Sequence, residues 1–203
     1  TAARVFDLAS SGLSFEQAAT QVHRESSGCT AGCNPAHRCA SIAMAAFIPD
    51  ALVGTAAQKE AMLTHRHPLA GDVAAAVASI CRALIRGLTW PEAIAFAAGG
   101  RLPETQRALG ARDSDGLSAG GYAPVVLRAA VFFLHDSPSF SAALDRAMDF
   151  AGPSNYCPVL VGCIGGAKWG RTAIPDSDLP DDGALLERIS NAAAALGKAW
   201  GRA

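Results

Sequence analysis

The sequence predicts an all-α fold, and three observations support this prediction. Half of the 203 residues are hydrophobic and only 17% are charged, which is enough apolar material for one sizeable core. Alanine, the residue with the highest helix propensity, is very frequent, whereas aromatic residues make up only 6%. Helix-start signals recur, and no alternating strand pattern persists for more than a few residues. We therefore expect closely packed helices in one domain spanning residues 1–203.

Two capping-box patterns mark helix starts in the first half. Ser14 with Gln17 opens a helix that we expect to run to about Glu25. Thr89 with Glu92 opens a second one. In each pair the first side chain and the one three residues later satisfy free backbone N–H groups of the first turn.

A long helix is expected between these two, over residues 68–86. Pro68 suits its first turn and Gly87 its C-terminal stop. Apolar residues recur at helical spacing along it, namely Val73, Val77, Ile80, Cys81, Leu84 and Ile85.

The second half predicts further helices. Residues 122–135 read as a buried helix, and either Ser139 or Ser141 starts another that ends before Gly152. A last helix is expected over residues 182–200, capped by the Asp182 side chain.

Residues 155–170 predict a helix in which Gly162, Gly166 and Gly170 lie four apart. Because glycine costs helix stability, this spacing suggests that a neighbouring helix approaches the backbone closely. The clearest loop is residues 110–121, and residues 29–35 form a second irregular stretch.

Charge and hydropathy argue against nucleic-acid and membrane partners, and the cysteines indicate the redox environment. The net charge is −1, and no run of Lys or Arg exceeds two residues, so we expect neither nucleic-acid nor membrane binding. The longest strongly apolar stretch, residues 158–167, is shorter than the ~20 residues that a bilayer requires. The six cysteines match no disulfide framework, which favours reduced thiols in a cytoplasmic protein.

Three stretches together resemble the ADP-ribosylglycohydrolase family, which includes the J1 crystallins. Residues 32–38 (GCNPAHR) resemble a Gly-Asn-Gly-Ser-x-Met-Arg segment, and residues 63–68 (LTHRHP) resemble a Leu-Thr-His-x-x-Pro segment before the same alanine-rich helix. Residues 152–170 resemble a Gly-Asp-Thr-Asp-Thr turn with its Ala-Gly-x-x-x-Gly-Ala helix, and residues 174–175 match an Ile-Pro pair. The family is longer at the N-terminus by about one hundred residues, more than ordinary loop variation.

The resemblance implies a site for two divalent cations, usually magnesium, which this chain has lost. Hard cations need several converging carboxylate or hydroxyl oxygens. The positions aligned with the family's Asp-Thr-Asp-Thr turn are Pro153, Ser154, Asn155 and Tyr156, so both carboxylates are replaced. The family's other metal ligands lie in its longer N-terminal part. We therefore expect no metal ligands and no cofactor in this chain.

Cys157 and His65 are the candidates for replacement chemistry. Cys157 lies near a predicted helix N-terminus, where a thiol pKa can fall, and His65 sits in the best-preserved polar motif and would serve as its base. The alternatives are that Cys157 is a small buried hydrophobe and that His65 only braces the turn before the long helix. The expected substrate-binding residues are Asn155, Tyr156, Asn34, His37, Ser154 and His67.

A zinc site is a weaker alternative. Its ligands would be Cys29, Cys33, Cys39, His23 and His37, although the Cys-x-x-x-Cys spacing is not that of a zinc knuckle.

Two classes of function follow. The first is a hydrolase- or lyase-like enzyme that acts on a small molecule without metals. By analogy with other old folds recruited into such pathways, it could serve secondary-metabolite biosynthesis. The second is a non-catalytic protein that binds a ligand or a partner, or is structural like the J1 crystallins. Retained ADP-ribosyl N-glycoside hydrolysis is a third alternative. The expected partners are a small molecule, and either a second copy or another chain that supplies the N-terminal segment.

Overall fold

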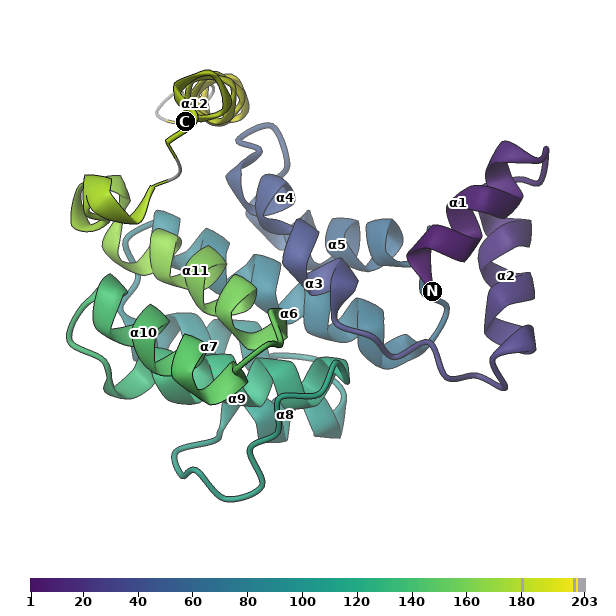
Figure 1. The fold of residues 1–203 in the computed structure, drawn as a ribbon, viewed down its shortest axis with the longest axis horizontal. Helices are drawn as coiled ribbons and strands as arrows, with labels where there is room; N and C mark the ends of the chain where they lie inside the picture. The colour runs from purple at the N-terminus through teal and green to yellow at the C-terminus, as the bar shows by residue number, and fades with distance from the viewer. Residues whose placement is uncertain (180, 199, 201–203) are drawn as a thin grey trace.

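The computed structural model describes residues 1–179, 181–198 and 200, and it confirms the all-α fold (Figure 1). In this part of the chain the one β-type pairing is an isolated antiparallel bridge between Gly32 and Tyr122. The helices are α1 (Ala2–Ser10), α2 (Phe15–Glu25), α3 (Asn34–Arg38), α4 (Ala40–Met44), η1 (Asp50–Leu52), α5 (Val53–Ala61), α6 (Pro68–Ile85), α7 (Trp90–Ala98), α8 (Pro103–Leu109), α9 (Ala123–Asp136), α10 (Phe140–Ala151), α11 (Tyr156–Trp169), η2 (Arg171–Ala173), η3 (Asp176–Asp178) and α12 (Gly183–Gly197).

Helix α6 is the centre of the core, with 15 of its 18 residues buried. It packs against α3, α4, α5, α7, α8, α9 and α11. Its small side chains permit this, because alanines let several helices approach one axis at close range. By length and hydropathy alone α6 is apolar enough to cross a membrane, but 83% of it is buried inside the protein, as expected of a core helix.

The predicted ends of α6 are confirmed. His67 is the N-cap residue, and its Nδ1 accepts a hydrogen bond from the backbone N–H of Leu69 at 3.2 Å. Pro68 occupies the first helical position. Gly87 follows the last turn with φ +87°, the left-handed conformation that glycine adopts without strain.

Helices α1 and α2 form a hairpin at one side of the molecule, purple in Figure 1. The hairpin has a small apolar core of its own, formed by Val5, Ala18, Ala19 and Val22. The predicted capping box between Ser14 and Gln17 is present. The chain leaves α2 through residues 26–33 and enters the main helical body at α3.

Helices α9, α10 and α11 form one neighbouring group, and their predicted positions are confirmed within two residues. Ser139 is the N-cap of α10. The predicted close approach at the glycine ladder is wrong, because a Cβ at Gly162 or Gly166 would meet no atom within 4 Å. The glycine of α11 that a neighbouring side chain approaches closely is Gly165, where an added Cβ would lie 3.2 Å from the Phe140 ring. Glycine spacing alone did not reveal which side of the helix faces its neighbour.

Helix α12 lies against α4, at the yellow end of the chain in Figure 1. Asp182 caps it as predicted, accepting from the backbone N–H of Leu185. The helix ends at Gly197, earlier than expected. Trp200 then donates from Nε1 to the Met44 carbonyl at 2.8 Å and stacks under the Arg86 guanidinium.

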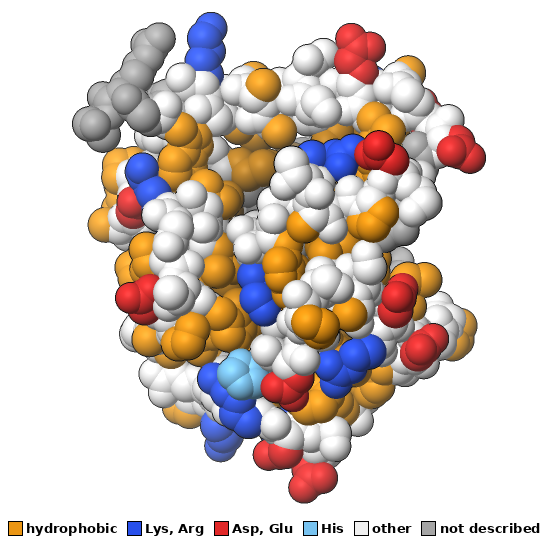
Figure 2. Space-filling view, turned by 90° about the vertical axis from the view of Figure 1, so that its left-hand side faces the viewer, with side chains coloured by type: hydrophobic (Ala, Val, Ile, Leu, Met, Phe, Trp, Pro, Cys, Tyr) orange, Lys and Arg blue, Asp and Glu red, His pale blue; other side chains and the backbone are white. Residues whose placement is uncertain are grey.

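The face shown in Figure 2 carries acidic and basic side chains scattered among apolar and neutral ones. No large basic patch is visible on this face.

Candidate functional site

His65 lies on the turn before α6 and is 1% exposed. Its Nδ1 is 2.8 Å from the Thr64 hydroxyl, which in turn accepts a hydrogen bond from Arg38. Burial and the neighbouring Arg38 charge lower the pKa of His65 to about 4. The imidazole is therefore neutral at physiological pH and a weak base. Its Nε2 faces the backbone of Gly32, where an added Cβ would lie 3.3 Å away.

The turn at 153–156 brings two of the predicted binding residues together. His37 donates from Nε2 to the Tyr156 carbonyl at 3.0 Å, and the two rings stack with centroids 6.3 Å apart. Burial lowers the pKa of His37. The Tyr156 ring also lies so close to Gly121 that a Cβ there would be 3.0 Å from it. The phenol therefore fills the space beside this turn.

The other predicted binding residues near this turn, Ser154, Asn155 and Asn34, do not join the contact between His37 and Tyr156. Ser154 donates its hydroxyl to the Ala119 carbonyl at 3.0 Å, which ties the turn to the 110–121 loop. Asn155 is exposed and makes no capping hydrogen bond at the start of α11. Asn34, the first residue of α3, is also exposed.

The geometry does not support Cys157 as a nucleophile. Its side chain is 2% exposed and belongs to the main apolar core. Burial raises the pKa of the thiol to about 12, so the thiolate is essentially absent at neutral pH. The helix N-terminus lowers a thiol pKa only when the sulfur faces its free N–H groups, and here burial prevails.

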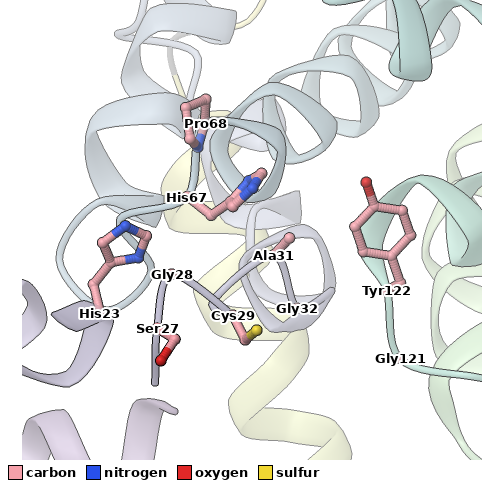
Figure 3. Close-up of a pocket in the computed structure, with 10 residues that line it drawn as sticks. All are labelled: His23, Ser27, Gly28, Cys29, Ala31, Gly32, His67, Pro68, Gly121 and Tyr122. Atoms are coloured by element: carbon pink, nitrogen blue, oxygen red, sulfur yellow. The ribbon is translucent and has the colours of Figure 1, made fainter. Parts of the chain in front are cut away.

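A pocket of about 790 Å³ lies elsewhere, between the end of α2 and the starts of α6 and α9 (Figure 3). Of the predicted site residues only His67 lines it. Its wall is formed by His23, Ser27, Gly28, Cys29, Ala31, Gly32, His67, Pro68, Gly121 and Tyr122.

The Thr30 hydroxyl connects the His23 imidazole to the backbone of His67 in this pocket. It is 2.6 Å from Nδ1 of His23 and accepts the backbone N–H of His67 at 3.1 Å. Thr30 itself is 1% exposed. One buried oxygen thus connects α2, the 26–33 segment and the N-cap of α6. Sequence reasoning missed this, because His23 and Thr30 match no motif and only folding brings them to His67.

Replacing Thr30 with valine is expected to destabilise the fold by about 1–3 kcal/mol, the cost of leaving buried polar groups unpaired. The variant keeps the side-chain shape but removes the oxygen that serves both His23 and the His67 N–H. Urea denaturation measures the effect. Thr105→Val is the matched control, because the buried Thr105 hydroxyl has no hydrogen-bond partner among the described residues, and its loss should be neutral or stabilising. Equal destabilisation by the two variants would contradict the bridging role of Thr30.

Comparison with known proteins identifies the family to which the chain belongs. The chain matches the family model described as ADP-ribosylglycohydrolase over residues 2–202. The chain belongs to the ADP-ribosylglycohydrolase family. A solved structure described as an ADP-ribosylglycohydrolase-related protein complex has a TM-score of 0.71 and 24% sequence identity to it. The match covers 83% of this chain and 60% of that one, and at this identity it concerns the fold alone. A search of the curated proteins finds no match.

The donor set at 153–156 does not fit the two divalent cations that the ADP-ribosylglycohydrolase resemblance implies. Proline offers no side-chain ligand, the Ser154 hydroxyl is engaged with a carbonyl, and the Asn155 amide is neutral. Among the described residues, no three His, Cys, Asp or Glu side chains are grouped so that they could hold a metal ion. The same finding argues against the zinc alternative at Cys29, Cys33 and Cys39 with His23 and His37.

Proposed function

We propose that this ADP-ribosylglycohydrolase-family protein acts on a small molecule without divalent metals, and that its site is the pocket between His23 and His67. One observation carries the proposal. The turn that should supply carboxylates supplies none, whereas a pocket of about 790 Å³ nearby presents the imidazoles of His23 and His67, with a buried hydroxyl between the His23 ring and the His67 backbone. A cavity with a few fixed polar groups is the usual form of a small-molecule site.

The chemistry assigned to this pocket is proton donation in a hydrolase- or lyase-like reaction. Imidazole is the side chain that most often serves as general acid or base. His67 is held by Leu69 and His23 by Thr30, so both rings are oriented before a ligand enters. In this assignment His23 and His67 replace the Cys157–His65 pair, because a protonated core thiol and a weakly basic, buried imidazole are unsuited to the role. Gly32 separates His65 from the pocket as part of its wall.

Thermal melting with added ligands tests the metal-independent assignment. The probes are ADP-ribose and small aromatic fragments, each added in EDTA or in magnesium chloride. We expect at least one probe to raise the melting temperature equally in both buffers, because no described ligand set requires the cation. Stabilisation only with magnesium would contradict the loss of the metal site. No stabilisation by any probe would contradict the pocket as a small-molecule site.

A second candidate function is binding of another protein chain. The similar solved structure is described as a complex, and the present chain spans 60% of that relative's length. On α12 the apolar residues Leu185 and Ile189 are exposed by 38% and 55%. Size-exclusion chromatography coupled to light scattering distinguishes a monomer from a homo-oligomer, and a strictly monomeric protein would argue against self-association.

A further inference from the structure

The hydrogen bonds around His67 fix its tautomer. Nδ1 accepts the backbone N–H of Leu69, so in the neutral ring this nitrogen carries no proton. The proton of the neutral imidazole is therefore on Nε2. The ring lines the pocket, and the Nε2–H group is its available donor.

Thr30 fixes the tautomer of His23 by a similar argument. Its oxygen already accepts the His67 backbone N–H, and it has one proton of its own. The atom 2.6 Å away is Nδ1 of His23. If His23 donated from Nδ1, the hydroxyl proton of a side chain that is 1% exposed would be left unpaired, which is costly. Thr30 therefore donates to Nδ1, and His23 carries its proton on Nε2.

The electrostatic surroundings of the pocket favour negative charge. In the part of the chain that the structure describes, no Asp, Glu, Lys or Arg lines it. His67 is the N-cap of the 18-residue helix α6, and Tyr122 is the N-cap of the 14-residue helix α9. The N-terminal ends of both helices carry partial positive charge. Figure 3 shows His67 and Tyr122 on facing sides of the pocket, with His23 on the side of α2.

From these observations, and resting on the proposed function, we propose that the ligand carries an oxyanion, a carboxylate or a phosphate, which the Nε2–H groups of His23 and His67 bind. Thr30 holds the His23 ring and the His67 backbone, and the Leu69 N–H orients the His67 ring, so the two donors belong to one preformed wall. Ordered N–H donors without a competing carboxylate select anionic oxygens over neutral ones. The apolar part of the lining, with Ala31, Pro68 and Tyr122, accommodates the rest of the ligand.

Matched pairs of fragments test the charge requirement in the intact chain. Phenyl phosphate is compared with phenol, and benzoate with benzamide, by NMR titration that follows the imidazole ¹⁵N and ring ¹H signals. We expect Nε2–H tautomers for His23 and His67 in the free protein. We also expect at least one anion of the two pairs to bind roughly tenfold more tightly than its neutral partner, the value of one charge-assisted hydrogen bond. The member of the pair that binds identifies phosphate or carboxylate as the group recognised.

The variants His23→Asn and His67→Asn remove Nε2 while keeping a side-chain acceptor near the position of Nδ1. Each should preserve the hydrogen bond from Thr30 or Leu69, and so the fold, yet lower anion affinity about tenfold. His135→Asn, at an exposed histidine on α9 outside the pocket lining, is the control and should change nothing. An Nδ1–H tautomer at either residue, or unchanged anion binding in both pocket variants, would overturn the inference. If phenol and benzamide bind as well as the anions, the inference fails while the small-molecule site stands; if no fragment binds, the site itself fails.

Discussion

Replacing Arg82 with methionine is expected to destabilise the protein by about 3–5 kcal/mol, the usual cost of removing one partner of a buried charged network. The Arg82 side chain rises from α6 and is 1% exposed. It donates to the Asp50 carboxylate at 2.5 Å and to four backbone carbonyls at the end of α4 and beyond, those of Ile42, Ala43, Ala45 and Ile48. The Ala45 carbonyl also accepts the backbone N–H of Ile48, and Arg82 supplies a side-chain donor to all four carbonyls, which lie at a helix end and just beyond it.

Urea denaturation of Arg82→Met measures this contribution, because methionine keeps most of the side-chain volume and removes the donors together with their positive charge. Arg86→Met is the matched control, one helical turn further along the same face. Arg86 is largely exposed and pairs with the same Asp50, at 3.2 Å. Its loss should cost about 1–2 kcal/mol, the sum of a surface ion pair and an exposed stack on Trp200. Similar costs for the two variants would mean that the buried network contributes little.

Acid is expected to destabilise the protein by about 3 kcal/mol through His65, because folding lowers the pKa of this side chain. The pKa of His65 is about 4 in the folded protein, below the ordinary value of 6.5 that the unfolded chain should have. As the pH falls, the unfolded chain therefore binds the proton first, and folding stability decreases. The contribution is complete above pH 6.5, declines between pH 6.5 and 4, and is lost below pH 4.

The free energy of unfolding measured between pH 7 and pH 4 tests this, with His65→Asn as the comparison. Asparagine offers an acceptor for the Thr64 hydroxyl but does not titrate, so the variant should show a much smaller pH dependence. A slope in the same direction should remain from His37, whose pKa burial also lowers. An unchanged pH profile in the variant would exclude His65 as the main titrating group.

Local signals in the sequence predicted the helices that carry their own start and stop residues. The capping boxes at Ser14 and Thr89 and the Pro68 start are all present. The short helices α3, α4 and α8, together with α1 and α5, were not predicted, because their ends lack such paired signals. Tertiary packing stabilises several of them. Arg82 caps the end of α4, and the buried Asp72 carboxylate accepts the backbone N–H of Leu102 at the start of α8.

The candidate site was predictable only in part. The resemblance of residues 63–68 to a family motif singled out His65 as a catalytic residue and His67 as a binding residue, but it did not indicate which ring lines a pocket. His65 is buried under Gly32, while His67 caps α6 and lines the pocket. Which histidine reaches solvent depends on how the 26–33 segment crosses the turn, and no local pattern encodes that crossing.

The sequence by itself determined the helical composition, the family and the absence of carboxylates at 153–156, because each of these is a property of residue identity and local spacing. Only the tertiary structure decided that Cys157 is a protonated core thiol, and that His23 joins His67 through Thr30. The physical reason is that burial and hydrogen-bond partnership arise between segments distant in sequence. These long-range contacts set the protonation state of each candidate group and whether it faces a cavity.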